Sequence, residues 1–172
     1  MKWFGNKEAS KGKGKKGDAG EGTVRVSDFL SEKRILFFHA GQSKQQVLGS
    51  LIAALDLADP NAALKAILAR EEVGTTVVSK GLALPHARIP GIRRLRAAVG
   101  ISPQGVVADH KTNPDPIHVF VLFLGPADNM KEHLGFLAAV SNLFQQEGFQ
   151  DALLSQKASA EALRFIAARE GE

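Results

Sequence analysis

The feature that most constrains the fold is the segment 117–124, Ile-His-Val-Phe-Val-Leu-Phe-Leu. Its β-branched and aromatic residues are typical of a strand, and its nearly continuous apolarity indicates that both faces of that strand are covered. The chain has 172 residues, 44% of them hydrophobic, which is enough to bury the core of one domain. We therefore expect a single-domain α/β sandwich, in which helices flank a mixed central sheet.

Other patterns in the sequence predict the helices and strands around this segment. Ser43 and Gln46 form a capping-box pattern ahead of apolar residues at helical spacing, and Gly74 is expected to stop a second helix. The expected helices are 43–56, 60–72, 129–145, 149–155 and 159–169, with an amphipathic element at 24–30. The expected strands are 35–38, 77–78, 82–84, 96–101 and 117–124. Residues 103–116 are predicted to be a loop with at most a short strand at 105–108.

The helix expected over 129–145 carries a second informative histidine. Asp128 is expected to cap it, and Glu132 is well placed in its first turn. Four residues are expected to share one face: Leu134, Leu137, Ser141 and Phe144. His133 lies in the first turn, where the helix dipole disfavours protonation of the ring. Taken alone, a solvated first-turn histidine is the simpler interpretation.

The basic charge of the chain belongs to its N-terminus. Of the formal net charge of +4, residues 1–25 hold seven basic and three acidic residues, which leaves fifteen of each in the rest. Residues 1–22, rich in Gly and Lys, are expected to be a disordered tail ahead of a domain over 23–172. We interpret the tail as a solvated extension, with contact to RNA, DNA or anionic lipid as the alternative. No nucleic acid is expected on the neutral folded domain.

The sequence contains no cysteine, which excludes disulfides, thiolate metal sites and a cysteine nucleophile. No apolar run is long enough to cross a membrane, and none follows the basic N-terminus as a secretory signal requires. We therefore expect a soluble, cytoplasmic protein without membrane insertion.

Residues 74–88 place one histidine beside a strand. The apolar pairs on either side of residues 79–81 predict two short strands joined by a turn, because Gly81 tolerates the positive φ that such turns need. Pro85 then keeps the chain stiff, so His86 is expected at the end of a strand in a defined orientation. From these residues alone, a functional histidine and a turn histidine without a task remain equally good interpretations.

Familiar catalytic motifs are absent from the sequence. There is no Gly-rich phosphate loop, and no GxGxxG, HExxH or GxSxG motif. His39, His110 and His118 are scattered, and we interpret them as structural or surface residues. A histidine-based metal hydrolase is a weak interpretation, because no carboxylate-rich ligand spacing accompanies the histidines.

Three linked motifs carry a family resemblance. They are Arg-Glu-Glu-Val-Gly-Thr-Thr at 70–76, Gly-Leu-Ala-Leu-Pro-His at 81–86, and Lys-Glu-His-Leu at 131–134. Together, over about residues 24–170, they resemble the enzyme IIA domains of the bacterial phosphotransferase system, of the mannitol/fructose and nitrogen-regulatory type. The order and spacing of three motifs are more specific than any one of them alone.

The resemblance implies that His86 accepts a phosphoryl group from the phosphohistidine of HPr or a paralogue. The group then passes to an enzyme IIB, or stays as a regulatory signal. The resemblance also implies that Arg70 holds the phosphoryl oxygens, with a hydroxyl from Thr75 or Thr76, and that His133 either helps to hold these oxygens or steadies the acceptor ring. Because the donor is itself a phosphoprotein, no cofactor and no metal are expected.

Two positions depart from the family pattern. Ala87 follows the acceptor where the family usually has Gly, and the turn that is often Gly-Asn-Gly reads Ser-Lys-Gly at 79–81. Lys80 and Arg88 add positive charge near the site, either as phosphate ligands or as solvated residues. Two function classes remain open: a phosphocarrier, or a non-catalytic regulatory binding module of the same fold. The lone domain, without a fused transport or IIB segment, is expected to favour regulation.

Overall fold

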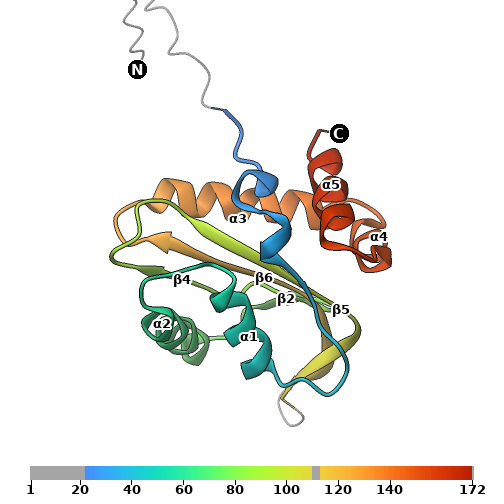
Figure 1. Cartoon of the computed structure of the whole chain (residues 1–172), viewed down its shortest axis with the longest axis horizontal. Helices are drawn as coiled ribbons and strands as arrows, with labels where there is room; N and C mark the ends of the chain where they lie inside the picture. The colour runs from blue at the N-terminus through green and yellow to red at the C-terminus, as the bar shows by residue number, and fades with distance from the viewer. Residues whose placement is uncertain (1–21, 110–112, 172) are drawn as a thin grey trace, which may run out of the picture.

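The computed structural model describes residues 22–109 and 113–171, and within them a mixed sheet lies between two layers of helices (Figure 1). This arrangement confirms the expected α/β sandwich. The predicted tail over 1–22 lies outside the described residues except for Gly22, and so does His110.

The sheet has six strands in the order β1-β5-β6-β3-β2, and β4 pairs with β6 beyond β3. The strands are β1 (Ile35–Phe37), β2 (Val77–Ser79), β3 (Leu82–Ala83), β4 (His86–Ile89), β5 (Arg96–Asp109) and β6 (Asn113–Pro126). β5 and β6 are antiparallel, whereas β1 is parallel to β5 and both β3 and β4 are parallel to β6. The central β6 therefore holds the ends of two short strands in register along one edge.

Helices cover both faces of the sheet. The elements α1 (Lys44–Ala53) and α2 (Pro60–Val73) lie on one face, and α3 (Met130–Gln145), α4 (Phe149–Ser155) and α5 (Ser159–Arg169) lie on the other (Figure 1). Two short 3-10 helices, η1 (Val26–Phe29) and η2 (Glu32–Arg34), precede β1. No helix among the described residues has the length and apolarity needed to cross a membrane.

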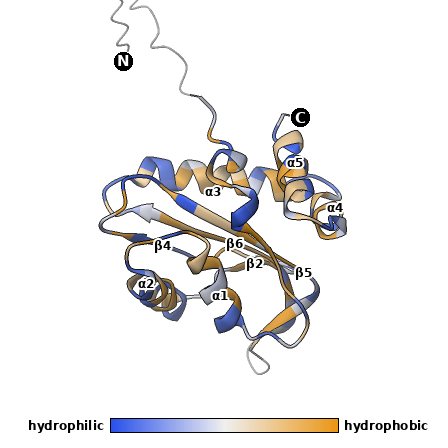
Figure 2. Cartoon of the chain, viewed as in Figure 1, coloured by the Kyte–Doolittle hydropathy of each residue, from blue (hydrophilic) through white to orange (hydrophobic). Residues whose placement is uncertain are grey.

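The apolar run of β6 is explained by its two covered faces. Alternate side chains of a strand point to opposite sides, so β6 contributes to two separate buried clusters. Val119, Val121 and Phe123 pack on the side of α3–α5. Phe120, Leu122 and Leu124 pack on the side of α1–α2. Figure 2 shows the same hydrophobic band along the middle of the sheet.

The prediction of a loop over 103–116 is wrong in large part. β5 continues to Asp109 and β6 already begins at Asn113, so residues 103–109 and 113–116 belong to two strands that pair with each other. The register shifts between Ile101 and Val106, where Gly105 adopts a φ of +81°. A bulge of this kind absorbs the turn-forming residues without ending the strand.

The cap expected for the helix over 129–145 is also wrong, by one residue. α3 is capped by the side chain of Asn129 rather than Asp128, and its buried residues are His133, Phe136, Val140 and Leu143. Leu134 is 54% exposed. The helix is therefore rotated so that His133, rather than its neighbour, faces the sheet.

Candidate functional site

β4 and β6 position His86. The sequence predicted that His86 ends the strand containing Leu82, but the ladder breaks at Pro85 and His86 opens β4 instead. The chain returns to the edge of β6 at once, because Phe123 donates its backbone N–H to the carbonyl of Pro85 and pairs in register with His86. The imidazole is therefore half-buried at the start of a strand that is paired with the centre of the sheet.

Two contacts define the orientation of the His86 ring. Its Nδ1 lies 2.6 Å from the carbonyl oxygen of Leu84. The ring also stacks on Phe123, with centroids 5.1 Å apart and planes 9° apart. Since a carbonyl only accepts hydrogen bonds, Nδ1 of the neutral ring carries the proton and Nε2 keeps a lone pair.

His133 joins His86 from the other layer. It comes from the first turn of α3, is 7% exposed, and its ring centroid lies 5.4 Å from that of His86. Its Nδ1 is buried without a hydrogen-bond partner among the described residues. The backbone of β6 approaches it closely, because a Cβ on Gly125 would lie 2.9 Å from this Nδ1. Gly125 thus leaves the space that His133 occupies.

Both imidazoles favour their neutral forms. Burial is the main cause that lowers the pKa of His86 from 6.5, and the charge of Arg70 adds to it, whereas the Leu84 hydrogen bond and Glu71 act in the opposite direction. Burial also lowers the pKa of His133, followed by the charges of His86 and Arg88. The sequence predicted a neutral His133 from the helix dipole; the direction is confirmed, but burial is the main cause.

We expect acidification to destabilise the fold through these two rings. As the pH falls from about 6.5 through the lower pKa values of the folded protein, the unfolded chain binds more protons than the native one, so the free energy of unfolding decreases. Urea unfolding at a series of pH values measures this slope. A His86→Gln/His133→Gln variant serves as the control and should show a shallower slope; an equal slope would contradict the assignment.

The predicted arginines lie around the two rings. Arg70, near the end of α2, is close enough for its charge to lower the pKa of His86, and it donates to the carbonyl of Gly74 over 3.3 Å. Arg88 is exposed on β4 and donates to the carbonyl of Ala127 over 3.3 Å. Residues two apart on a strand share a face, so Arg88 is on the side of His86. The methyl group of the intervening Ala87 packs in the opposite cluster, away from the imidazole.

The two predicted threonines differ in position. Thr75 is exposed, and its hydroxyl accepts from the backbone N–H of Val77 over 3.1 Å. Thr76 is buried, and its hydroxyl donates to Glu71 over 2.7 Å. The backbone carbonyl of Thr76 also accepts from the N–H of Leu84 over 2.9 Å. Thr76 therefore braces the segment ahead of His86, while the hydroxyl hydrogen of Thr75 remains available.

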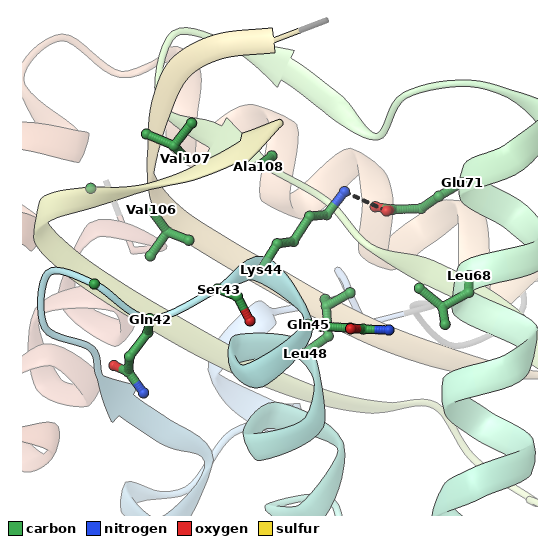
Figure 3. Close-up of a pocket in the computed structure, with 12 residues that line it drawn as sticks. Gln42, Ser43, Lys44, Gln45, Leu48, Leu68, Glu71, Val106, Val107 and Ala108 are labelled. Carbon is green, nitrogen blue, oxygen red and sulfur yellow. Dashed lines mark hydrogen bonds and ion pairs between the residues drawn. The ribbon is translucent and has the colours of Figure 1, made fainter. Parts of the chain in front are cut away.

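A cavity of about 710 Å³ lies apart from the histidines (Figure 3). It opens between the start of α1, the end of α2 and the far half of β5, and the ion pair between Lys44 and Glu71 crosses it. Glu71 is thereby held by Lys44 on one side and by Thr76 on the other. Neither imidazole lines this cavity.

Sequence reasoning missed three residues that shape the site: Phe123, Gly125 and Glu71. Sequence reasoning treated Phe123 only as part of a strand. Its position two residues before a glycine at the strand end is a weak signal of a role in the site. Across residues 22–109 and 113–171, no group of three His, Asp or Glu side chains is arranged to hold a metal ion.

Comparison with known proteins identifies the family of this chain. The family model described as "Phosphoenolpyruvate-dependent sugar phosphotransferase system, EIIA 2" matches residues 28–169. The chain therefore belongs to the EIIA type 2 family of that system. Its members are phosphotransferase components, which accept a phosphoryl group and transfer it.

Three curated relatives illustrate the range of the family. The fructose-specific EIIA component of Haloferax volcanii is 32% identical over 113 residues, or 62% of this chain and 73% of that protein. The nitrogen regulatory protein of Escherichia coli is 28% identical over 152 residues, or 87% and 93%. The fructose-specific EIIABC component of Bacillus subtilis is 26% identical over 148 residues, or 83% of this chain, which spans only 23% of that longer protein.

Solved structures share the fold. The nitrogen regulatory protein IIA-Ntr of Neisseria meningitidis has a TM-score of 0.72 at 21% identity, covering 82% of this chain and 98% of that one. Enzyme IIA mannitol of Escherichia coli, solved in complex with phosphorylated enzyme IIB, has a TM-score of 0.62 at 17% identity, covering 81% and 97%. At these identities the likeness establishes the architecture.

Proposed function

We propose that His86 is the phosphoryl acceptor of this phosphotransferase component. The observation that carries the proposal is the ring itself: a half-buried imidazole whose Nδ1 is bonded to Leu84 and whose Nε2 has no partner among the described residues. A lowered pKa keeps the lone pair on Nε2 at neutral pH. A neutral nitrogen of this kind attacks phosphorus without a separate base.

His86 loses no proton in the proposed transfer step. Nε2 attacks the phosphorus in line, the nitrogen–phosphorus bond of the donor phosphohistidine breaks, and the donor ring recovers the electron pair. The Nδ1–H bond to Leu84 stays in place and stabilises the positive charge that develops on the ring. The new bond is again nitrogen to phosphorus, so the group remains reactive enough to be passed on.

Donors around the ring fit the phosphoryl oxygens. Nδ1 of His133 has no acceptor for a proton, so we place the proton of this neutral ring on Nε2, where it can be donated to an oxygen. The guanidinium groups of Arg70 and Arg88 supply positive charge, and the exposed hydroxyl of Thr75 supplies a further donor. We do not assign this role to Thr76, because its hydroxyl already donates to Glu71.

We propose an HPr-like phosphocarrier as the donor and an enzyme IIB or a regulated protein as the recipient, acting in the cytoplasm. The mannitol IIA structure in complex with phosphorylated IIB supports the recipient. Exposed apolar side chains also support docking here: Val73 ends α2 and is 85% exposed, while Met130 and Leu134 near the start of α3 are 45% and 54% exposed. Such residues are typical of protein contact surfaces.

A regulatory binding module is the second candidate function. Relatives named nitrogen regulatory proteins, which this chain matches over most of their length, favour it. In this case the phosphorylation state of His86, or the surface alone, controls a partner protein.

Incubation with phosphoenolpyruvate, enzyme I and the cognate HPr-like carrier, followed by intact-mass measurement, distinguishes a phosphoryl acceptor from a module that acts through its surface alone. A carrier gains the mass of one phosphoryl group, and acid treatment removes it because the nitrogen–phosphorus bond is acid-labile. No gain with a competent carrier would leave the non-catalytic binding module as the function.

We expect His133→Ala to slow phosphorylation rather than to abolish it, by roughly 10²–10³-fold, the usual loss for one preorganised donor. Gly125→Ala is expected to slow it as well, because the added Cβ would lie 2.9 Å from Nδ1 of His133 and displace that ring. Quenched-flow mass spectrometry measures both rates. Gly49→Ala, where nothing lies within 4 Å of the new Cβ, is the matched control and should keep the wild-type rate.

A further inference from the structure

We propose that an arginine-rich rim beside the two histidines selects a phosphoryl donor with an acidic docking surface. The rim consists of Arg88 on β4 together with Arg93 and Arg94 in the loop between β4 and β5. The inference rests on the proposed function of His86 and names the kind of carrier protein that this chain accepts.

Backbone contacts place the rim next to the site. Arg88 shares the face of β4 with His86 and reaches the loop between β6 and α3. The loop that contains Arg93 and Arg94 leads directly into Leu95, whose N–H donates to Glu132 over 2.9 Å. Glu132 immediately precedes His133 in the first turn of α3. Both arginines therefore lie beside the turn that supplies the second imidazole.

The charge of the rim is not neutralised within the described part of the chain. The ion pairs there are Arg25–Glu170 and Lys44–Glu71, and neither involves the rim. Arg88, Arg93 and Arg94 are all exposed. Glu132 and the exposed Asp128 are carboxylates on the neighbouring turn, but neither forms an ion pair with the rim among the described residues.

The negative charge of one phosphoryl group is too small to require all the arginines near the site. A phosphoryl group carries a charge of about −1.5 to −2, which Arg70 and Arg88, the two arginines whose charges act on the imidazoles, can balance. Arg93 and Arg94 are then free to pair with carboxylates of the donor protein. Complementary charges raise association rates by about 10–10³-fold, and like charges slow association, so this rim disfavours a basic donor.

Charge reversal tests the proposal. The kcat/KM for phosphorylation by the phosphorylated HPr-like carrier of the source organism is measured for wild type and R93E/R94E, at about 20 mM and about 300 mM NaCl. K157E/R164E is the matched control, because both residues are exposed on the α4–α5 side, at the end of the molecule opposite β4 (Figure 1). Phosphoramidate, a small phosphoryl donor without a protein surface, reports the chemistry of His86 alone.

We expect kcat/KM of R93E/R94E to fall roughly 10–100-fold at low salt, with a smaller loss at high salt, while K157E/R164E stays near wild type. Phosphorylation by phosphoramidate should be equal in all three proteins. An unchanged or faster rate with the carrier overturns the acidic-donor proposal and leaves the function of His86 intact. An unchanged rate together with lost binding of a short RNA duplex assigns the rim to nucleic acid and also overturns the proposal. If neither donor phosphorylates His86 in wild type, the proposed function fails and this inference fails with it.

Discussion

His86→Ala is expected to lose the phosphoryl gain completely, because no other side chain in residues 22–109 and 113–171 offers an equivalent nucleophile. The His133 ring is almost fully buried, with its Nδ1 closed off from solvent. Of the histidines that the structure describes, only His86 combines a partnered Nδ1 with an open Nε2 and a lowered pKa. The measurement is intact mass after incubation with phosphoenolpyruvate, enzyme I and the HPr-like carrier, with circular dichroism to verify that the variant is folded.

His39→Ala and His118→Ala are the matched controls for this result. His39 is exposed before α1, and His118 lies on β6 with its Nδ1 3.1 Å from the carbonyl of Ser102. Both variants should gain one phosphoryl group like wild type. Phosphorus–nitrogen coupling in an NMR spectrum should also place the bond on Nε2 of His86. A gain in His86→Ala, or a bond on Nδ1, would refute the proposed geometry.

The second large effect is expected at Phe123, whose replacement by alanine should destabilise the fold by about 3–5 kcal/mol. The side chain is fully buried, with its ring 5.0 Å from His133 and 4.9 Å from Phe136 between centroids, in addition to the stack with His86. Removing it opens a cavity below both imidazoles and takes away the flat surface on which the acceptor lies. Urea unfolding monitored by circular dichroism measures the loss.

Phe165→Ala is the comparison for Phe123→Ala, since Phe165 on α5 is only partly buried and should lose clearly less stability. Phe123→Leu separates packing from stacking. It retains most of the buried apolar surface, so the variant should fold, but phosphorylation of His86 should slow because the ring loses its parallel partner. A loss below about 1 kcal/mol for Phe123→Ala would show that the ring is not a central packing element.

Several elements could be predicted from the sequence because their causes are local. The capping box at Ser43 is present, with both of its hydrogen bonds, and α2 ends at Gly74 as expected. Gly81 adopts the positive φ predicted for the turn between β2 and β3. The near-continuous apolarity of β6 identified the central strand, because only a strand covered on both faces needs such a composition.

Predictions failed where long-range contacts outweighed local preference. Residues 103–116 have the composition of a loop, yet pairing between β5 and β6 keeps those that the structure describes extended on either side of a bulge. Apolar spacing in α3 allows two neighbouring faces to be buried, and packing against the sheet selects the one that contains His133.

The order of helices and strands, the central strand and the three family motifs all follow from local patterns in the chain. The proximity of His86 and His133 does not: they are 47 positions apart in the chain, yet their ring centroids lie 5.4 Å from each other in the folded protein. They meet because β6 pairs with β4, which begins at His86, and is followed directly by α3, which contains His133. Both rings therefore lie near the end of β6. Phe123 and Gly125 on that strand then determine how the rings lie, one by stacking and the other by leaving space.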